Sequence, residues 1–256
     1  MTTVRDIYDY IDGFAPFRTQ MSFDNSGLLA GDPGAEVRSA LLALDITPGV
    51  VREAASRGAQ LVVSHHPVIF HPLRALEPGS APYLLAQNGI AAICAHTNLD
   101  LAPGGVNTCL AARLGLLDVE TLETDEACGL PCALMGRTAR PMEPREFAAF
   151  VKDALGCDGL FYTDGKRAVG LVSLCSGAGA DSLHAAAARG CEAFVTGEAK
   201  HHELIDAENL GVTLVAAGHY FTEDVVIGPL AERLGKRFPE VAFARAEASR
   251  CPAAYL

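Results

Sequence analysis

The sequence contains no tryptophan and is poor in basic residues, with 20 Lys and Arg against 31 Asp and Glu. The resulting net charge of −11 argues against a nucleic-acid-binding protein, because no basic stripe is available to displace counterions from phosphates. A small anionic substrate remains compatible with this charge, since a few local cations or metal ions can hold one. We therefore expect a small-molecule partner and no nucleic acid.

Long apolar runs are also missing. No stretch reaches the roughly 18 apolar residues that a membrane span requires, and the first residues carry acids where a signal peptide would have an uninterrupted apolar core. The eight cysteines include no Cys-x-x-Cys pair, so reduced thiols are a better interpretation than a zinc knuckle. These absences predict a cytoplasmic protein that does not enter a membrane.

What the sequence does contain is a series of short apolar runs without alternation, as in strands that are covered on both faces. They span residues 39–44, 60–63, 90–94, 193–195 and 212–215. Predicted helices lie at 48–57, 81–87 and 107–114, and Thr47-Pro48 marks the start of the first. This alternation predicts an α/β protein with a mainly parallel sheet.

Four of these runs are followed by His, Asp or Glu, which gives the candidates His65, His66, Asp100, Glu198 and His219. In open α/β sheets, ligands bind outside the carboxyl ends of the strands. We therefore expect these side chains to converge on one site. The segment from about residue 123 to residue 188 is also of α/β character, but no cluster of potential metal ligands follows its predicted strands. We expect two interlinked α/β domains: a discontinuous metal-binding domain of residues 1–124 and 190–256, and a smaller inserted domain of residues 125–189.

The pair His65-His66 has two interpretations. Adjacent side chains on a strand point to opposite faces, so the pair would share one ion only if the chain bends. Each histidine could instead reach a different ion, or one could be a core residue and the other a surface residue.

Near the other end of the chain, Thr222 is a natural N-cap for a helix over 223–234. It would place Glu223 in the first helical turn, where the alternative role is to complement the helix dipole.

The candidates include three histidines, His65, His66 and His219, and two carboxylates, Asp100 and Glu223. This combination of ligands suits zinc, manganese, iron or nickel better than calcium or magnesium. Five protein ligands exceed what one catalytic metal normally takes while leaving a position open, so two divalent ions that share a carboxylate fit better. Glu198 is a candidate general acid or base, or a hydrogen-bond partner of a ligand histidine. Lys200 could hold a substrate anion, and His201 and His202 are either catalytic or solvated.

Two glycine-containing segments complete the candidates. Residues 176–181 resemble the start of a dinucleotide-binding loop, but Ser182 stands where its third glycine would be. A tight turn is the alternative, and a nicotinamide or flavin enzyme would rest on this segment alone. Residues 102–107 form a glycine turn before a helix, which either binds an anion or orients Asp100.

At these residues the sequence resembles the GTP cyclohydrolase I type 2 family, also called the Nif-three-like family. The resemblance runs along nearly the whole chain, and its most specific stretches are SHHPVIFHPL, AHTNLDLAPGGVN, TGEAKHHELIDAENLG and AGHYFTED. It implies a two-domain α/β subunit with a dinuclear metal centre, assembled into a ring-shaped homohexamer, a trimer of dimers. The metal ligands that it implies are His65, His66, Asp100, His219 and Glu223, with His96 and Glu198 as polar residues near the metals.

The first hypothesis is therefore a metal-dependent hydrolase in which Glu198 or His96 moves protons. The resemblance names GTP as a substrate, with attack that opens the imidazole ring of guanine. Hydrolysis of a phosphoester or an amide would use the same site. A non-catalytic metal-binding or adaptor protein that acts through its ring assembly is the alternative from another class.

Overall fold

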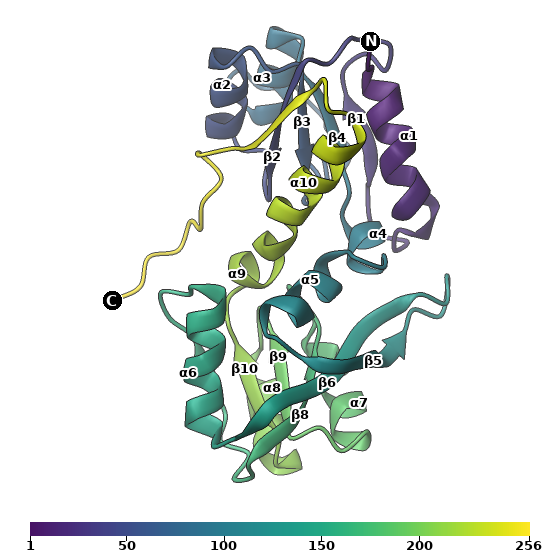
Figure 1. Ribbon diagram of the computed structural model, residues 1–256. Helices are drawn as coiled ribbons and strands as arrows, with labels where there is room; N and C mark the ends of the chain where they lie inside the picture. The colour runs from purple at the N-terminus through teal and green to yellow at the C-terminus, as the bar shows by residue number, and fades with distance from the viewer. The chain divides into compact units, whose positions relative to one another are not determined.

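The computed structural model describes residues 1–256, which divide into two compact units. Unit 1 comprises Met1–Pro103 and Ile227–Arg250, and unit 2 comprises Gly104–Val226 and Cys251–Leu256. Each unit contains one β-sheet with helices packed on it (Figure 1). This arrangement confirms the predicted α/β class.

The sheet of unit 1 is mainly parallel, as the sequence predicted. Its strands lie in the order β1 (Gly27–Ala30), β4 (Ala91–Cys94), β3 (Leu61–Ser64), β2 (Ser39–Ala43) and β11 (Ala242–Arg245). Strands β4, β3, β2 and β11 are parallel to one another, and only β1 is antiparallel to its neighbour. The carboxyl ends of β3 and β4 therefore meet at one edge, where His65, His66 and His96 follow.

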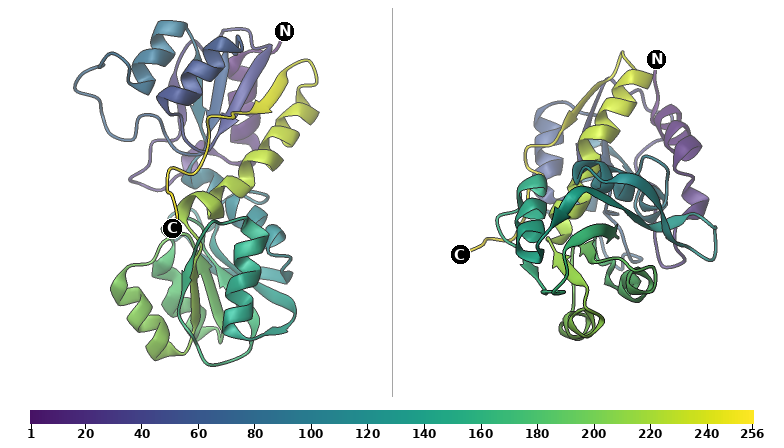
Figure 2. Two further views of the ribbon diagram at one scale, coloured as in Figure 1. Left: turned by 90° about the vertical axis from the view of Figure 1, so that its left-hand side faces the viewer. Right: turned by 60° about the horizontal axis from the view of Figure 1, so that its bottom comes forward.

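Helices cover both faces of this sheet. Helices α2 (Pro48–Ser56) and α3 (Ala81–Asn88) pack on one face through a core that includes Leu41 and Val62. Helices α1 (Val4–Phe14) and α10 (Ile227–Arg237) lie on the other face, as Figures 1 and 2 show. Because both faces are covered, the central strands β2, β3 and β4 consist almost entirely of buried apolar residues. The short η1 (Phe17–Thr19) and α4 (Thr97–Asp100) lie in the loops of this unit.

The sheet of unit 2 is mixed. Its strands lie in the order β5 (Leu117–Thr124), β6 (Pro131–Met142), β8 (Val169–Leu174), β9 (Ala193–Thr196), β10 (Thr213–Ala216) and β7 (Phe161–Tyr162). The central pairs β8–β9 and β9–β10 are parallel, and the outer pairs are antiparallel. Glu198 and His219 follow the carboxyl ends of the central strands β9 and β10.

Alternate residues of these central strands enter two different cores. Val195 and Val215 pack with helices α5 (Val106–Arg113) and α6 (Pro144–Leu155). Phe194 and Leu214 pack on the opposite face with α7 (Leu183–Ala188) and α8 (His201–Leu210). The short η2 (Ala180–Ser182) precedes α7, and α9 (His219–Glu223) and η3 (Asp224–Val226) complete the unit.

The division differs from the predicted one in a way that matters for the site. Strands β9 and β10 pair with β8, so residues expected in the larger domain belong to the sheet of unit 2. The apolar runs thus form two sheets rather than one. His65, His66 and Asp100 accordingly belong to unit 1, whereas His219 and Glu223 belong to unit 2.

A second difference concerns the helix predicted to start at Glu223. The chain turns helical earlier, at His219, so Thr222 lies inside α9 and is not an N-cap. Its hydroxyl instead accepts a hydrogen bond from the Gly177 amide at 3.1 Å. Glu223 is the last residue of α9 and not part of a first turn, so its role is not to complement a helix dipole. No helix is long and apolar enough to cross a membrane.

Glu53 of α2 ties this helix to the segment after β11. Its carboxylate accepts hydrogen bonds from the amides of Ala248 at 2.8 Å and Glu247 at 3.1 Å, and from Arg57 at 2.8 Å. Burial alone would raise the pKa of Glu53, but these hydrogen bonds outweigh it and hold the pKa below its ordinary value of 4.5. The ionised form therefore stabilises the fold.

Replacing Glu53 with Gln is expected to lower the free energy of unfolding by about 1–2 kcal/mol at neutral pH. Because the folded-state pKa is lowered, this contribution is present above pH 4.5 and disappears as the pH falls through the folded-state value. Urea unfolding of both proteins across this range measures it. Glu232→Gln is the control, since Glu232 is 75% exposed and lies 3.9 Å from Lys236. An equal loss in both variants would contradict the assignment.

Candidate metal-binding residues

Three histidines of unit 1 lie together at the end of its sheet. Strand β3 ends at Ser64, and the Ser64 hydroxyl donates to the His66 carbonyl at 2.7 Å, which closes a bend. The bend brings the rings of His65 and His66 to 5.1 Å between centroids, and His96 lies 5.2 Å and 5.4 Å from them. One ring nitrogen of each lies within 4.8 Å of the others. The bend that the sequence analysis left open is therefore present.

Each of these rings is held through its Nδ1 atom. The Nδ1–H groups donate to the Ala95 carbonyl at 2.9 Å from His65, to Asp45 at 2.8 Å from His66, and to Asp24 at 2.7 Å from His96. A carbonyl or carboxylate oxygen can only accept, so the proton of the neutral ring lies on Nδ1. The lone pair then lies on Nε2, which is how a histidine is prepared to bind a metal ion.

Asp24 is a buried carboxylate that orients the His96 ring. Its side chain is fully buried, and it also accepts from the Thr97 amide at 3.0 Å and the Thr97 hydroxyl at 2.5 Å. Burial would raise the pKa of Asp24, but the hydrogen bonds from His96 and Thr97 hold it well below its ordinary value. Asp24 is therefore an anion whose hydrogen bonds set the orientation of the His96 ring.

Asp100 and Cys94 complete the surroundings of His65. The Asp100 Oδ1 atom lies 3.6 Å from His65 Nε2, at the end of the short helix α4. Cys94 is buried, which raises the pKa of its thiol well above the ordinary value. The thiol donates to the His65 carbonyl at 2.9 Å and is part of the buried core. The candidate ligands of unit 1 are thus imidazole nitrogens and a carboxylate.

Unit 2 carries a second histidine–carboxylate set, formed by His219 and Glu223 of α9 together with Glu198, which follows β9. His219 Nδ1 lies 3.0 Å from Glu198 Oε1, and His219 Nε2 lies 2.9 Å from Glu223 Oε2. Glu223 is buried, whereas the Glu198 side chain is 61% exposed. Two ligand atoms about 3 Å apart have the separation found around one ion with metal–ligand distances of about 2.1 Å.

The loop at residues 176–179 packs directly behind this set. Gly177 has φ +59°, its amide donates to Thr222, and its carbonyl accepts from the Gly197 and Glu198 amides at 2.9 and 3.0 Å. A Cβ atom on Gly177 would lie 2.1 Å from Glu223 Oε1. Of the two interpretations of this segment, a dinucleotide-binding loop or a tight turn, the contacts favour the tight turn. The turn packs against the Glu223 carboxylate.

The other sequence candidates lie outside these sets. Lys200 precedes α8, and His201 and His202 lie in its first turn, all three exposed to solvent. Asp24, Asp45 and Gly177 support the candidate ligands, yet the sequence analysis did not name them as site residues. Asp45 could have been found from the sequence, because it directly follows the apolar run at residues 39–44. Asp24 lies far from His96 in the sequence and could not have been found in this way.

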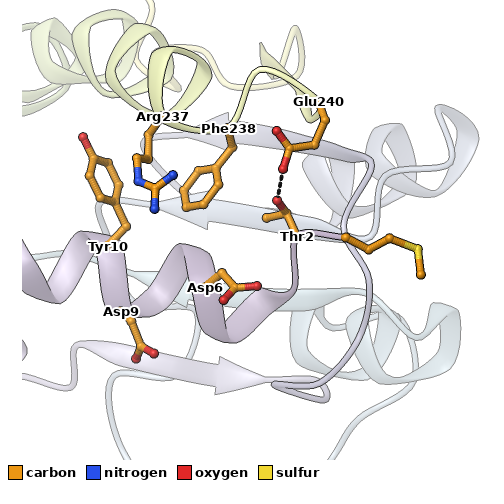
Figure 3. A pocket seen from close by; sticks show the side chains of 8 residues that line it. Thr2, Asp6, Asp9, Tyr10, Arg237, Phe238 and Glu240 are labelled. Carbon is orange, nitrogen blue, oxygen red and sulfur yellow. Dashed lines mark hydrogen bonds between the residues drawn. The ribbon is translucent and has the colours of Figure 1, made fainter.

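Unit 1 also has a recess of about 520 Å³ between α1 and the end of α10 (Figure 3). Asp6, Asp9, Glu240 and Arg237 contribute its charges, and Glu240 accepts a hydrogen bond from Thr2. The guanidinium of Arg237 lies over the rings of Phe238 and Tyr10, 4.9 Å and 5.8 Å from their centroids. None of the predicted site residues lines this recess.

The chemistry of both sets suits metal ions. Imidazole nitrogens whose lone pair lies on Nε2, together with carboxylates, are typical ligands of zinc and the neighbouring transition metals. The buried His, Asp and Glu groups could therefore bind metal ions. The fold and these residues define a two-unit α/β protein with histidine–carboxylate sets of the metal-ligand type.

Comparison with known families agrees with this class. Residues 2–252 match the family described as Duf34/NIF3 (NGG1p interacting factor 3), and the chain belongs to this family. The GTP cyclohydrolase 1 type 2 homolog of Clostridium perfringens is 29% identical over 91% of this chain and 92% of its own length. The GTP cyclohydrolase 1 type 2 of Helicobacter pylori is 29% identical over 87% of this chain and 88% of its own.

Solved structures show the same fold. The Staphylococcus aureus protein SA1388 superposes with a TM-score of 0.93 at 26% identity, covering 100% of this chain and 99% of that one. A Bacillus cereus protein related to NIF3 gives a TM-score of 0.92 at 22% identity, with all of both chains covered. The resemblance drawn from the sequence motifs is therefore confirmed.

Proposed function

We propose that this protein is a hydrolase that depends on two divalent metal ions and acts on GTP. The ions are held by His65, His66, Asp100, His219 and Glu223. The observation that carries the proposal is the hydrogen bonding of the histidine rings. In His65, His66 and His96 the Nδ1–H group donates to a carbonyl or carboxylate oxygen, so that Nε2 presents its lone pair, whereas both ring nitrogens of His219 lie within 3.0 Å of carboxylates.

The proposed number of ions rests on the number of candidate ligands. Five ligands exceed what one open catalytic ion takes, whereas two ions would use all five. Zinc, iron, manganese and nickel all suit such a set, and availability decides among them. When bound, the ions supply a hydroxide at neutral pH by lowering the pKa of a coordinated water.

The chain's own residues prepare and assist this chemistry. Asp45, Asp24 and the Ala95 carbonyl orient the rings of unit 1, and Glu198 orients His219. Glu198 is exposed beside His219 and can exchange protons with a substrate, so it is our candidate general acid or base. His96, oriented by Asp24, is the second candidate for this role.

The names of the relatives suggest the substrate. The Helicobacter pylori protein is named GTP cyclohydrolase 1 type 2, and several other relatives are named GTP cyclohydrolase 1 type 2 homolog. For this chain the corresponding reaction is attack of water on the imidazole ring of guanine, which opens that ring. We also propose the homohexameric ring, a trimer of dimers, that the family resemblance implies.

Incubation with GTP tests the activity. The protein loaded with zinc, manganese or iron is expected to open the guanine ring, which changes the absorbance of the base and which chromatography of the product can verify. Glu198→Gln should lower turnover by about 10²- to 10⁴-fold with metal content unchanged, because glutamine still accepts from His219 but cannot take a proton.

Glu208→Gln is the matched control for Glu198→Gln, since Glu208 is exposed on α8. It should leave turnover unchanged. If the loaded protein leaves GTP intact but cleaves a phosphoester or an amide, the substrate class is wrong. If it binds metal and hydrolyses nothing, the metal-binding or adaptor alternative replaces the enzyme.

A further inference from the structure

A recess of about 380 Å³ lies within unit 2, beside the turn that carries His219. Gly197 and Gly218 line it, and they directly precede Glu198 and His219 in the chain. Both glycines follow the carboxyl ends of parallel strands, β9 and β10. Ligands of α/β proteins bind at such ends, and the volume lies within the usual range of small-molecule pockets.

The lining of this recess has a distinctive composition. Its large side chains include the aromatic rings of Phe161 from β7 and Tyr255 from the C-terminal segment. Its one charged side chain is the carboxylate of Asp158, and no Lys or Arg takes part. A phosphate group would meet a like charge and no cation here. A planar ring with N–H donors would meet aromatic surface and an acceptor.

The Tyr255 ring is 42% exposed and packs on its other side against residues of unit 2. It lies against Gly159, where a Cβ atom would be 2.6 Å from the ring. The Tyr255 hydroxyl would lie 3.4 Å from a Cβ on Gly218, and the ring of Phe221 is 6.5 Å away between centroids. An exposed aromatic ring offers a stacking surface, and a ring with two side-chain torsions loses little entropy on binding.

We propose that this recess binds the heterocyclic base of the substrate. The base stacks on Phe161 or Tyr255, and Asp158 accepts hydrogen bonds from two adjacent N–H groups at its edge. Guanine has such an edge, since its ring N–H and its exocyclic amino group lie side by side. Hypoxanthine has only the first of these donors, and adenine presents a ring nitrogen lone pair that a carboxylate repels. The inference rests on the proposed function in naming a purine.

Binding of nucleosides to the metal-free protein tests this inference apart from the metal centre. Guanosine, inosine and adenosine are titrated into the full chain by calorimetry in the presence of a chelator. Guanosine should bind about ten- to hundred-fold more tightly than inosine, because one hydrogen bond to a charged group is lost. Adenosine should bind more weakly than either.

Two variants, each with a matched control, locate the site. Asp158→Asn should remove most of the preference for guanosine over inosine, whereas Asp153→Asn, on the exposed side of α6, should retain it. Phe161→Ala should weaken guanosine binding about tenfold. Tyr162→Ala is its matched control. The two residues are neighbours on β7, are 48% and 38% exposed, and point to opposite faces, and only Phe161 lines the recess.

Equal affinity for the three nucleosides, no binding of any of them, or equal losses in Phe161→Ala and Tyr162→Ala would each overturn the inference. Absence of bound metal or of GTP turnover, with guanosine binding intact, would overturn the proposed function and leave this inference standing. The two failures are therefore distinguishable.

Discussion

Replacing Gly177 with alanine is expected to displace Glu223 and to weaken metal binding by about a hundredfold. The added Cβ would lie 2.1 Å from Glu223 Oε1, 3.1 Å from its Cδ and 3.4 Å from His219 Cε1. Glu223 is buried, so its carboxylate has little room to move aside. The backbone adds a cost of about 1–2 kcal/mol, because φ is +59° at this position.

Calorimetric titration with zinc and thermal unfolding measure the two effects in Gly177→Ala. Gly190→Ala separates them, since Gly190 has φ +77° and no atom within 4 Å of its Cβ position. That control should be destabilised by the backbone cost alone and should bind zinc as the wild type does. Wild-type zinc affinity in Gly177→Ala would show that Glu223 does not hold metal.

Replacing His65 with alanine is expected to remove at least one metal ion per chain and to abolish GTP turnover. His65 is fully buried, and its ring is held by the Ala95 carbonyl at 2.9 Å. Loss of a residue that merely supports a ligand costs about 10- to 100-fold in affinity, and loss of the ligand itself should cost at least as much.

Metal analysis after dialysis and GTP turnover are the measurements for His65→Ala, with His184→Ala as the control. His184 is 71% exposed on α7 and lies 3.8 Å from Asp206. Since His65→Ala also opens a cavity, thermal unfolding in the presence of chelator reports its effect on the fold separately. Full metal content in a folded His65→Ala protein would exclude His65 as a ligand.

Much of the fold could be predicted from local pattern. The run at 60–63 became β3 within one residue, and the helix start at Thr47-Pro48 was found where predicted, with the Thr47 hydroxyl accepting from the Val50 amide. Such signals depend only on neighbouring residues. Burial on both faces then explains why the central strands lack polar alternation.

The division into two sheets could not be predicted in the same way. Apolar runs show that strands exist, but which strand pairs with which depends on packing between distant segments. The predicted domain of residues 1–124 and 190–256 differs from the observed units for this reason. Strands β9 and β10 pair with β8, and β2, β3 and β4 pair with one another.

The candidate ligands were accessible to sequence reasoning, and their supporting residues were not. Histidines and carboxylates at strand ends are visible in any reading of the chain. The role of Asp24 depends on a contact with His96, which is 72 positions away. The role of Gly177 depends on lying against Glu223, 46 positions further on. Contacts of this kind follow only from the three-dimensional fold.

The measurement that tests the account most directly is the metal content of the wild-type protein, purified without added metal or chelator. Elemental analysis should find about two divalent ions per chain. A folded protein that contains almost no metal, and that also fails to take up zinc, manganese or iron, would contradict the dinuclear centre and with it the proposed hydrolase.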